Sequence, residues 1–336
     1  MKKNIRTILL LILCISLLVS CSSKSDDSSQ KESGSIDGQL TIFGGSVGGV
    51  WSVFTEGVSE AVRREHQGAN VSAVPGTVAG NVVAVSEGKA DFAISESLTA
   101  KFALDGTVNF DETHENIRAV AGIMPINVFQ LVAPKSVSFS SVEEVATKDL
   151  PMRYSAGEKN ALGDVISESV FEAYDLSYEL IEQNGGEVNF LSGPKTFELM
   201  SDARIDSLGK MVPIPASDIL EASATIDMKL IPIGDQAIDY LVEEYGVMPY
   251  TMEAGSYDFQ EEDYETVNTP TILITSEEID EETVYNVTKA IYNQLDYLAD
   301  VHNGFKEVND ETITEVGTIP LHPGAERFFK EEGLLE

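Results

Sequence analysis

Residues 40–51 read LTIFGGSVGGVW, a short β-prone run followed by a glycine-rich loop and the start of a segment with helical spacing of its apolar residues. Glycines at this junction let the backbone approach a ligand closely, and free N–H groups at a helix start favour an anionic group. The loop is not a nucleotide motif, because it lacks GxGxxG spacing and no Lys-Ser/Thr follows Gly49. The single Trp, Trp51, either packs in the core or stacks on a ligand as a wall, and we favour the wall.

Strand-like and helix-like segments alternate outward from this unit. The expected strands are residues 40–43, 71–74, 92–95, 117–124, 127–133, 152–156, 178–181, 205–208, 228–233 and 271–275. The expected helices are residues 53–64, 81–87, 163–174, 196–202, 216–222, 235–245 and 282–301, with an acidic loop at 257–265. This pattern, which restarts near residue 152, predicts α/β layers with mostly parallel sheets in two similar lobes.

Two further loops follow strands in the first half of the chain. In residues 75–81, PGTVAGN, Thr77 and Asn81 either donate to a ligand or cap the next helix. At the end of the next strand, Glu96 is either a solvated charge or a ligand acceptor. Open α/β sheets bind ligands beyond the carboxyl ends of their strands, so we expect these loops to meet at one site. The candidate ligand contacts here are Ser46, Val47, Gly48, Gly49, Trp51, Thr77, Asn81, Ser95, Glu96 and Ser97.

The N-terminus has the pattern of an export signal. Lys2, Lys3 and Arg6 precede an apolar run at 8–19 that is too short for a membrane span of about 20 residues, which predicts a signal peptide at 1–20. The run ends in LVSC, which resembles a bacterial lipobox and predicts a lipid on Cys21. The alternative is an ordinary secretory signal with a chance Cys.

The polar residues after Cys21 predict a flexible tether at 21–37, because they cannot bury enough surface to fold. The expected location is the outer face of the cell membrane, with the folded part outside the cytoplasm.

Composition excludes some classes of function. With 56 acidic against 22 basic residues, the net charge is −34, which makes nucleic acid a poor partner. The acidity favours solubility, or alternatively adaptation to a saline or alkaline habitat. The only cysteines are Cys14 and Cys21, so the mature domain is expected to contain no disulfide.

The sequence does not indicate an enzyme. The four His residues show no metal-ligand spacing, and there is no GxSxG elbow and no cysteine nucleophile in the mature domain. Calcium on the acidic loop would lack an EF-hand pattern. We therefore expect no catalytic residue, no metal and no cofactor.

From about Leu40 to the C-terminus, nearly the whole mature domain, the sequence resembles the TAXI-type substrate-binding proteins of tripartite ATP-independent periplasmic (TRAP) transporters. The loop before Trp51 is similar to the family's GxGGxYY-like opening, and residues 75–81 resemble its TGGSxEN segment. GKADFAI at 88–94 and IPLHPGA at 319–325, followed by FFKEEG at 328–333, match its GxADxAI and closing IPLHPGA…YxExG motifs. His322, within the closing motif, is expected to be structural.

The resemblance implies a type II periplasmic-binding-protein fold, in which two α/β lobes joined by two crossing strands close over a ligand in the cleft. It places lobe 1 at 38–133 and 268–336 and lobe 2 at 134–267, with crossings near Ala133 and Val267. Family ligands are small carboxylates and amino acids such as glutamate or 2-oxoglutarate, delivered to a TRAP permease. Alternatives are a component of an ABC importer, a sensor, or an enzyme on the same scaffold.

The chain departs from the family pattern at several positions. Where the family reads GPxGSGT, residues 157–163 read GEKNALG, so that Ala161 and Gly163 replace hydroxyl residues. Glu96 replaces a Gln, and Gln130 replaces a His of the crossing strand. A buried carboxylate needs a partner, which Lys159, Lys210 or a ligand amine would supply. The remaining candidate ligand contacts are Gln130, Asn160, Ala161 and Lys210.

Overall fold

The computed structural model describes residues 36, 38–45, 47 and 50–336. The expected signal peptide at 1–20 and Cys21 lie outside the described residues. Of the expected tether at 21–37, only Ile36 is described, and it is buried against the core of the first lobe. Of the glycine loop, Ser46, Gly48 and Gly49 lie outside the described residues.

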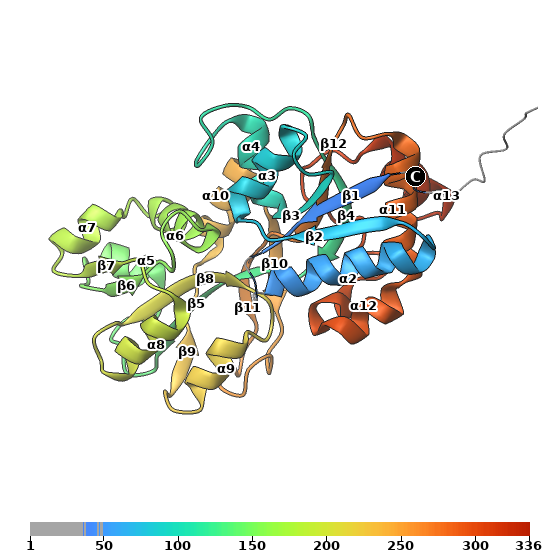
Figure 1. Cartoon of the computed structure of the whole chain (residues 1–336). Coiled ribbons are helices and arrows are strands. Elements are labelled where there is room, and N and C mark those ends of the chain that lie inside the picture. Colours follow the sequence, from blue (N-terminus) through green and yellow to red (C-terminus); the bar gives the residue numbers. More distant parts are fainter. Residues whose placement is uncertain (1–35, 37, 46, 48–49) are drawn as a thin grey trace, which may run out of the picture. The chain divides into compact units, whose positions relative to one another are not determined.

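The first lobe is built on a five-stranded sheet (Figure 1). In spatial order its strands are β2 (Asn70–Val74), β1 (Gln39–Phe43), β3 (Phe92–Glu96), β12 (Thr271–Ser276) and β4 (Ile117–Met124). Parallel pairing joins β1 to β2 and β3, whereas β12 runs antiparallel to both β3 and β4. All six side chains of β12 are buried, as expected for a strand with neighbours on both sides and helices over both faces.

The second lobe is built on a seven-stranded sheet. Its strands are β10 (Met248–Met252), β11 (Tyr264–Asn268), β5 (Val128–Pro134), β8 (Ser207–Val212), β6 (Arg153–Ser155) and β7 (Glu187–Asn189), with β9 (Met228–Leu230) paired to β5. Only β6 pairs in parallel, with β7 and β8, and the other pairs are antiparallel. The expectation of mostly parallel sheets is therefore wrong for this lobe, because β5 enters it antiparallel to three neighbours. It does not hold in the first lobe either, where β12 pairs antiparallel with both of its neighbours.

The chain changes sheet twice. It leaves β4 and enters β5 through residues 125–127, and it leaves β11 and enters β12 through residues 269–270. The first change comes earlier than the expected crossing near Ala133, because β5 pairs wholly within the second sheet. The second falls just after the expected crossing near Val267.

Helices cover both sheets. Those of the first lobe are α2 (Val50–Glu65), α3 (Val78–Ser86), α4 (Ser97–Asp105), α11 (Glu281–Asn293), α12 (Leu295–Val301), η1 (Asn303–Glu307) and α13 (Pro323–Glu331). Those of the second are α5 (Val142–Thr147), α6 (Leu162–Glu172), α7 (Tyr178–Gln183), α8 (Gly193–Ser201), α9 (Ser217–Ser223) and α10 (Asp235–Tyr245). Among the described residues, no helix has the length and apolar character needed to cross a bilayer.

Among the expected elements, one differs from the structure in type and another is interrupted, and the expected loop at 257–265 runs into β11 at Tyr264. Residues 178–181, expected as a strand, form α7, because the Ser177 hydroxyl accepts a hydrogen bond from the Leu180 N–H (3.1 Å) and starts a helix. The expected helix at 282–301 is divided at Gln294 into α11 and α12. The second piece packs Leu298 and Val301 against Gly57 of α2.

Candidate functional site

A cavity of about 220 Å³ lies between the lobes, with Glu96 at the end of β3 on one side and the second sheet on the other. We call it the inter-lobe cavity. Its other lining residues are Ala156, Gly157, Glu158, Ala161, Leu162, Gly163, Leu191, Ser192, Gly193, Leu208, Lys210 and Met211. The structure thus brings together three of the predicted contacts, Glu96, Ala161 and Lys210.

The second-lobe wall lies where the parallel strands β6 and β7 end. The chain leaves β6 into the loop at 156–161 and starts α6, and it leaves β7 into residues 190–192 and starts α8. The first of these helix starts packs closely on β8, because a Cβ on Gly163 would lie only 3.1 Å from the Lys210 Cα. Two helices therefore begin at one cavity, as is usual for ligand sites in open α/β sheets.

Neither helix start carries a side-chain cap. The N-cap residues are Ala161 for α6 and Ser192 for α8, and neither side chain makes a cap hydrogen bond. First-turn amides generally have no partner within their own helix, and the helix dipole is positive at this end. Two positions are exceptions here, because the Asp164 N–H donates to the Ala161 carbonyl oxygen (3.0 Å) and Pro194 of α8 has no N–H. Both starts can therefore donate to an anionic group in the cavity.

The cation of the cavity is Lys210 on β8. Its Nζ forms an ion pair with Asp218 on α9, and both side chains are mostly buried. Gly193 makes room for this pair at the start of α8, since a Cβ there would lie 3.1 Å from the Lys210 Nζ. Asp218 therefore neutralises much of the charge of Lys210, and the amides at the helix starts remain the main donors for an anion.

On the opposite wall, Glu96 is the N-cap residue of α4, yet its side chain makes no cap hydrogen bond. Its carboxylate accepts a hydrogen bond from the Thr99 hydroxyl (3.1 Å), and no ion pair among the described residues includes it. Burial raises the pKa of Glu96 to about 7, and the bond from Thr99 offsets this only in part. Near neutral pH this carboxyl group is half protonated.

Asn81 on α3 connects the loops of the first lobe. Its Nδ2 donates to the carbonyl oxygens of Gly44 (3.0 Å), after β1, and Ile94 (2.8 Å), on β3. The side chain is fully buried, and its Oδ1 has no partner among the described residues. Asn81 therefore holds the loops in place, and the predicted contact with a ligand is untested.

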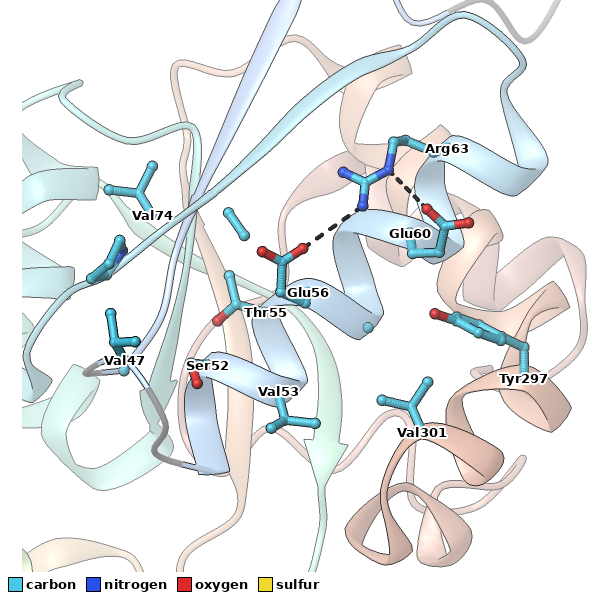
Figure 2. Close-up of a pocket in the computed structure, with 14 residues that line it drawn as sticks. Val47, Ser52, Val53, Thr55, Glu56, Glu60, Arg63, Val74, Tyr297 and Val301 are labelled. Atoms are coloured by element: carbon cyan, nitrogen blue, oxygen red, sulfur yellow. Dashed lines mark hydrogen bonds and ion pairs between the residues drawn. The ribbon is translucent and has the colours of Figure 1, made fainter.

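The glycine loop borders a second cavity, of about 550 Å³ (Figure 2). Val47 and Pro75 line it, and Val301 projects toward it from α12. The cavity is larger than the inter-lobe cavity, but all its lining residues belong to the first lobe.

The charged side chains that line this second cavity are paired with one another. The Arg63 guanidinium donates to Glu60 (2.9 Å) and to the Val71 carbonyl oxygen (2.8 Å), and it lies 3.8 Å from Glu56. The two glutamates outnumber the single arginine. An anionic solute would therefore meet net negative charge here, which favours the inter-lobe cavity for such a solute.

Other predicted contacts line neither cavity. Trp51 is half-buried against the core of the first lobe, and its carbonyl oxygen accepts from the Thr55 hydroxyl (2.6 Å). The Ser95 hydroxyl donates to the Glu96 carbonyl oxygen (3.0 Å), and the Ser97 hydroxyl lies 3.0 Å from that of Thr269. Ligand contacts at these positions remain predictions.

Thr77 and Asn160 stand at helix starts. Thr77 is the N-cap residue of α3 without a side-chain cap bond, and its carbonyl oxygen accepts from the Asn81 N–H (2.8 Å). Asn160 has a left-handed backbone (φ 63°), and its N–H donates to Asp164 (2.9 Å). Its carbonyl oxygen accepts from Asn109 of the first lobe (2.9 Å), which places Asn160 in a contact between the lobes.

Gln130 on β5 is fully buried within the second lobe. Its Oε1 accepts a hydrogen bond from the Tyr257 hydroxyl (2.7 Å), which in turn accepts from the Ala216 N–H (2.9 Å). Gln130 therefore fixes the segment around Tyr257 rather than lining the inter-lobe cavity.

Sequence reasoning missed the residues that complete the second-lobe wall. Ser192 and Gly193 carry a readable signal, because Pro194 follows them at a position typical of a helix start. Asp218 shows no such signal, since its contact with Lys210 depends on how α9 packs beside β8. In the described part of the chain, no group of three or more His, Cys, Asp or Glu side chains is arranged to hold a metal ion.

Comparison with known proteins gives one family and a shared fold. The model of the NMT1-like family matches residues 42–333. The structure of PhnD1 from Prochlorococcus marinus in complex with methylphosphonate is 10% identical, with a TM-score of 0.52 over 88% of this chain and 98% of that chain. MatC from Rhodopseudomonas palustris with bound malate is 11% identical, with a TM-score of 0.51 over 89% and 99%. At such identities the likeness shows the fold, two α/β lobes of the periplasmic-binding type.

Proposed function

Since this chain belongs to the NMT1-like family and has the two-lobed fold of periplasmic binding proteins, we propose that it is an extracytoplasmic solute-binding protein. It captures a small carboxylate, an amino acid or a similar small polar solute between its lobes. It then delivers the solute to a transporter in the membrane and performs no chemistry on it.

The observation that carries this proposal is the inter-lobe cavity. Two uncapped helix starts and Lys210 face a cavity that both lobes line. Its volume of about 220 Å³ is below the range of about 300–1,000 Å³ that drug-sized ligands occupy, which favours a small solute. The structures with bound methylphosphonate and malate support a small anion as the first class to test.

We further propose that the partner is a TRAP permease, because several segments of the chain resemble the TAXI family. The expected lobes are 38–133 with 268–336, and 134–267. Because β5 pairs with strands of the second sheet, we propose that the first boundary lies at 125–127 instead of at 133. An ABC importer or a sensor is the alternative. Solute uptake by intact cells separates the two transporters, since an ionophore abolishes uptake through a TRAP permease whereas ATP depletion at a held ion gradient abolishes uptake through an ABC importer.

Attachment through a lipid on Cys21 is the remaining proposal. Labelled palmitate is expected to enter the wild-type chain, and Cys21→Ala is expected to abolish both labelling and membrane retention. Equal retention of the variant would contradict attachment at this residue.

A matched pair of variants locates the solute. Ala161 is exposed at the inter-lobe cavity and Val53 is exposed at the second cavity, so Phe at either position adds bulk without entering the core. In calorimetry on the full chain in mild detergent, with a panel of carboxylates, amino acids and phosphonates, Ala161→Phe is expected to weaken binding by at least about tenfold, or about 1.4 kcal/mol. Val53→Phe is expected to leave the affinity within about twofold. The reverse result would move the site to the second cavity, and no binding across the panel would refute the proposed function.

A further inference from the structure

The carboxylate of Glu96 lacks the partner that a buried charge needs. Within the described residues it forms no ion pair, and its one side-chain partner is the hydroxyl of Thr99. A half-buried carboxylate without a cation is costly to keep ionised. The group therefore has unused capacity to accept hydrogen bonds, and it faces the cavity.

The cations on the cavity wall, on the loop that borders it and on the helix that follows Glu96 are already engaged. Lys210 lines the same cavity, but its ammonium group is paired with Asp218. The ammonium group of Lys159 lies over the ring of Phe190, 5.1 Å from its centroid. Lys101, on the helix that Glu96 starts, is paired with Asp105 (2.6 Å). Within the part of the chain that the structure describes, none of these three cations is free to pair with Glu96, which leaves the solute as a source of positive charge.

The two walls of the cavity differ in the charge they favour. The second-lobe wall offers amides at the starts of α6 and α8, which favour an anion. The first-lobe wall offers Glu96, which favours a hydrogen-bond donor that carries positive charge. A solute that satisfies both walls at once carries both charges.

We propose that Glu96 binds a positively charged nitrogen of the solute, so that the solute is a small zwitterion whose anionic group faces the starts of α6 and α8. This inference rests on the proposed function. It selects zwitterions over the dicarboxylates that the cavity would otherwise accept, and it makes Glu96 a specificity-determining residue.

The competing arrangement is a protonated Glu96 that donates to a carboxylate of the solute. The two arrangements respond to pH in opposite directions, because burial raises the pKa of Glu96 to about 7. A cationic nitrogen requires the ionised form, so affinity rises up to about tenfold per pH unit as pH approaches 7 and then levels off. A solute carboxylate requires the protonated form, so affinity falls above pH 7. The other charged groups lining the cavity are Glu158 and Lys210, the latter paired with Asp218.

The test compares amino acids with the same acids lacking the amino group, such as glutamate with glutarate and alanine with propionate. Binding to the full chain is measured by calorimetry from about pH 5.5 to about 8.5. We expect the zwitterion of a pair to bind at least about tenfold more tightly at pH 8, and Glu96→Gln to remove both this preference and the rise with pH. Glu87→Gln, which removes a carboxylate of the same lobe outside the cavity, is the control and is expected to keep both.

Each other outcome is decisive. Preferential binding of glutarate that weakens above pH 7, or an unchanged preference in Glu96→Gln, would overturn the assignment of Glu96 while leaving a solute-binding protein. Failure of every compound to bind, with a thermal melt showing folded protein, would refute the proposed function itself. A melt of Glu96→Gln excludes unfolding as the cause of any loss.

Discussion

The half-buried carboxyl group of Glu96 makes a quantitative prediction about stability in the absence of solute. Its ordinary pKa of 4.5 applies to the unfolded chain, and burial raises the pKa to about 7 in the folded protein. Between these two values the folded state binds more protons than the unfolded state, so stability falls as pH rises. The loss begins near pH 4.5 and is complete just above pH 7.

The size of this loss follows from the two pKa values. Each pH unit between them is worth about 1.4 kcal/mol, so the total is about 3.4 kcal/mol, and about 2.5 kcal/mol of it falls between pH 5 and pH 8. This is an upper limit, because the side chain of Glu96 is only partly buried and solvent screens its charge. Glutamine keeps the shape of the side chain and cannot ionise. The free energy of unfolding of Glu96→Gln is therefore expected to rise relative to wild type by up to that amount as pH increases.

Urea denaturation at pH 5 and pH 8 provides the measurement. Subtracting the free energy of unfolding of wild type from that of the variant at each pH cancels the contribution of all the other acidic residues, because the two proteins share them. Glu87→Gln again serves as the control, since its carboxylate is exposed and lies outside the cavity. If wild type and Glu96→Gln show the same dependence on pH, the carboxylate is not desolvated and the reasoning about the first-lobe wall is wrong.

Three other substitutions test the packing around the site. Asn81→Ala leaves the carbonyl oxygens of Gly44 and Ile94 without their donor, so urea denaturation is expected to show a loss of about 2–5 kcal/mol, and a loss below about 1 kcal/mol would contradict this role. Tyr257→Phe removes a buried hydroxyl that is bonded on both sides, and a loss of about 1–3 kcal/mol is expected, with an unchanged melt counting against it. The His322 ring accepts a hydrogen bond from the Gly324 N–H and contacts the Ile279 carbonyl oxygen, and burial lowers the pKa of the ring. NMR titration of His322 is therefore expected to give a pKa below 6.5, and the free energy of unfolding is expected to fall as pH drops below 6.5. A ring pKa at or above 6.5 would refute this.

Much of the architecture could be predicted because local pattern and tertiary packing agree. The helix at 235–245 begins and ends where expected, since apolar residues recur at helical spacing and Gly246 takes the left-handed conformation that ends it. The strand prediction at 178–181 was wrong, because the hydrogen bond from the Ser177 cap starts a helix in spite of the β-prone residues that follow it. β10 was missed because alternating exposure in a five-residue edge strand is a weak signal.

The candidate site was predictable only in part. The loops of the first lobe were expected to meet at one site, but Val47 and Pro75 line the second cavity whereas Glu96 lines the inter-lobe cavity. Of the predicted contacts, Ala161 and Lys210 lie at the inter-lobe cavity with Glu96. The sequence could not show that Asn81 points inward, because its partners are carbonyl oxygens on two segments distant in the chain. Nor could it show that Lys210 is neutralised by Asp218, which requires α9 to lie beside β8.

Glu96 lies beside the two crossings, so under the proposed function it would bind the solute close to the hinge. Glu96 pairs with Thr271, directly after the second crossing at 269–270. Asn268 ties the two crossings together, since its Oδ1 accepts from the Asn127 N–H (2.8 Å) and its Nδ2 donates to the Pro125 carbonyl oxygen (2.7 Å).

Segments held in this way can bend while their mutual register stays fixed, as hinge segments do. A carboxylate beside such a hinge moves little when the lobes rotate, whereas the starts of α6 and α8, which lie after strands farther from the crossings in the sheet order, move more. The solute would then bind first to a nearly stationary Glu96 and complete its contacts as the second-lobe amides close on its anionic group. If binding follows this order, the charge on Glu96 determines which solutes stay bound until the lobes close.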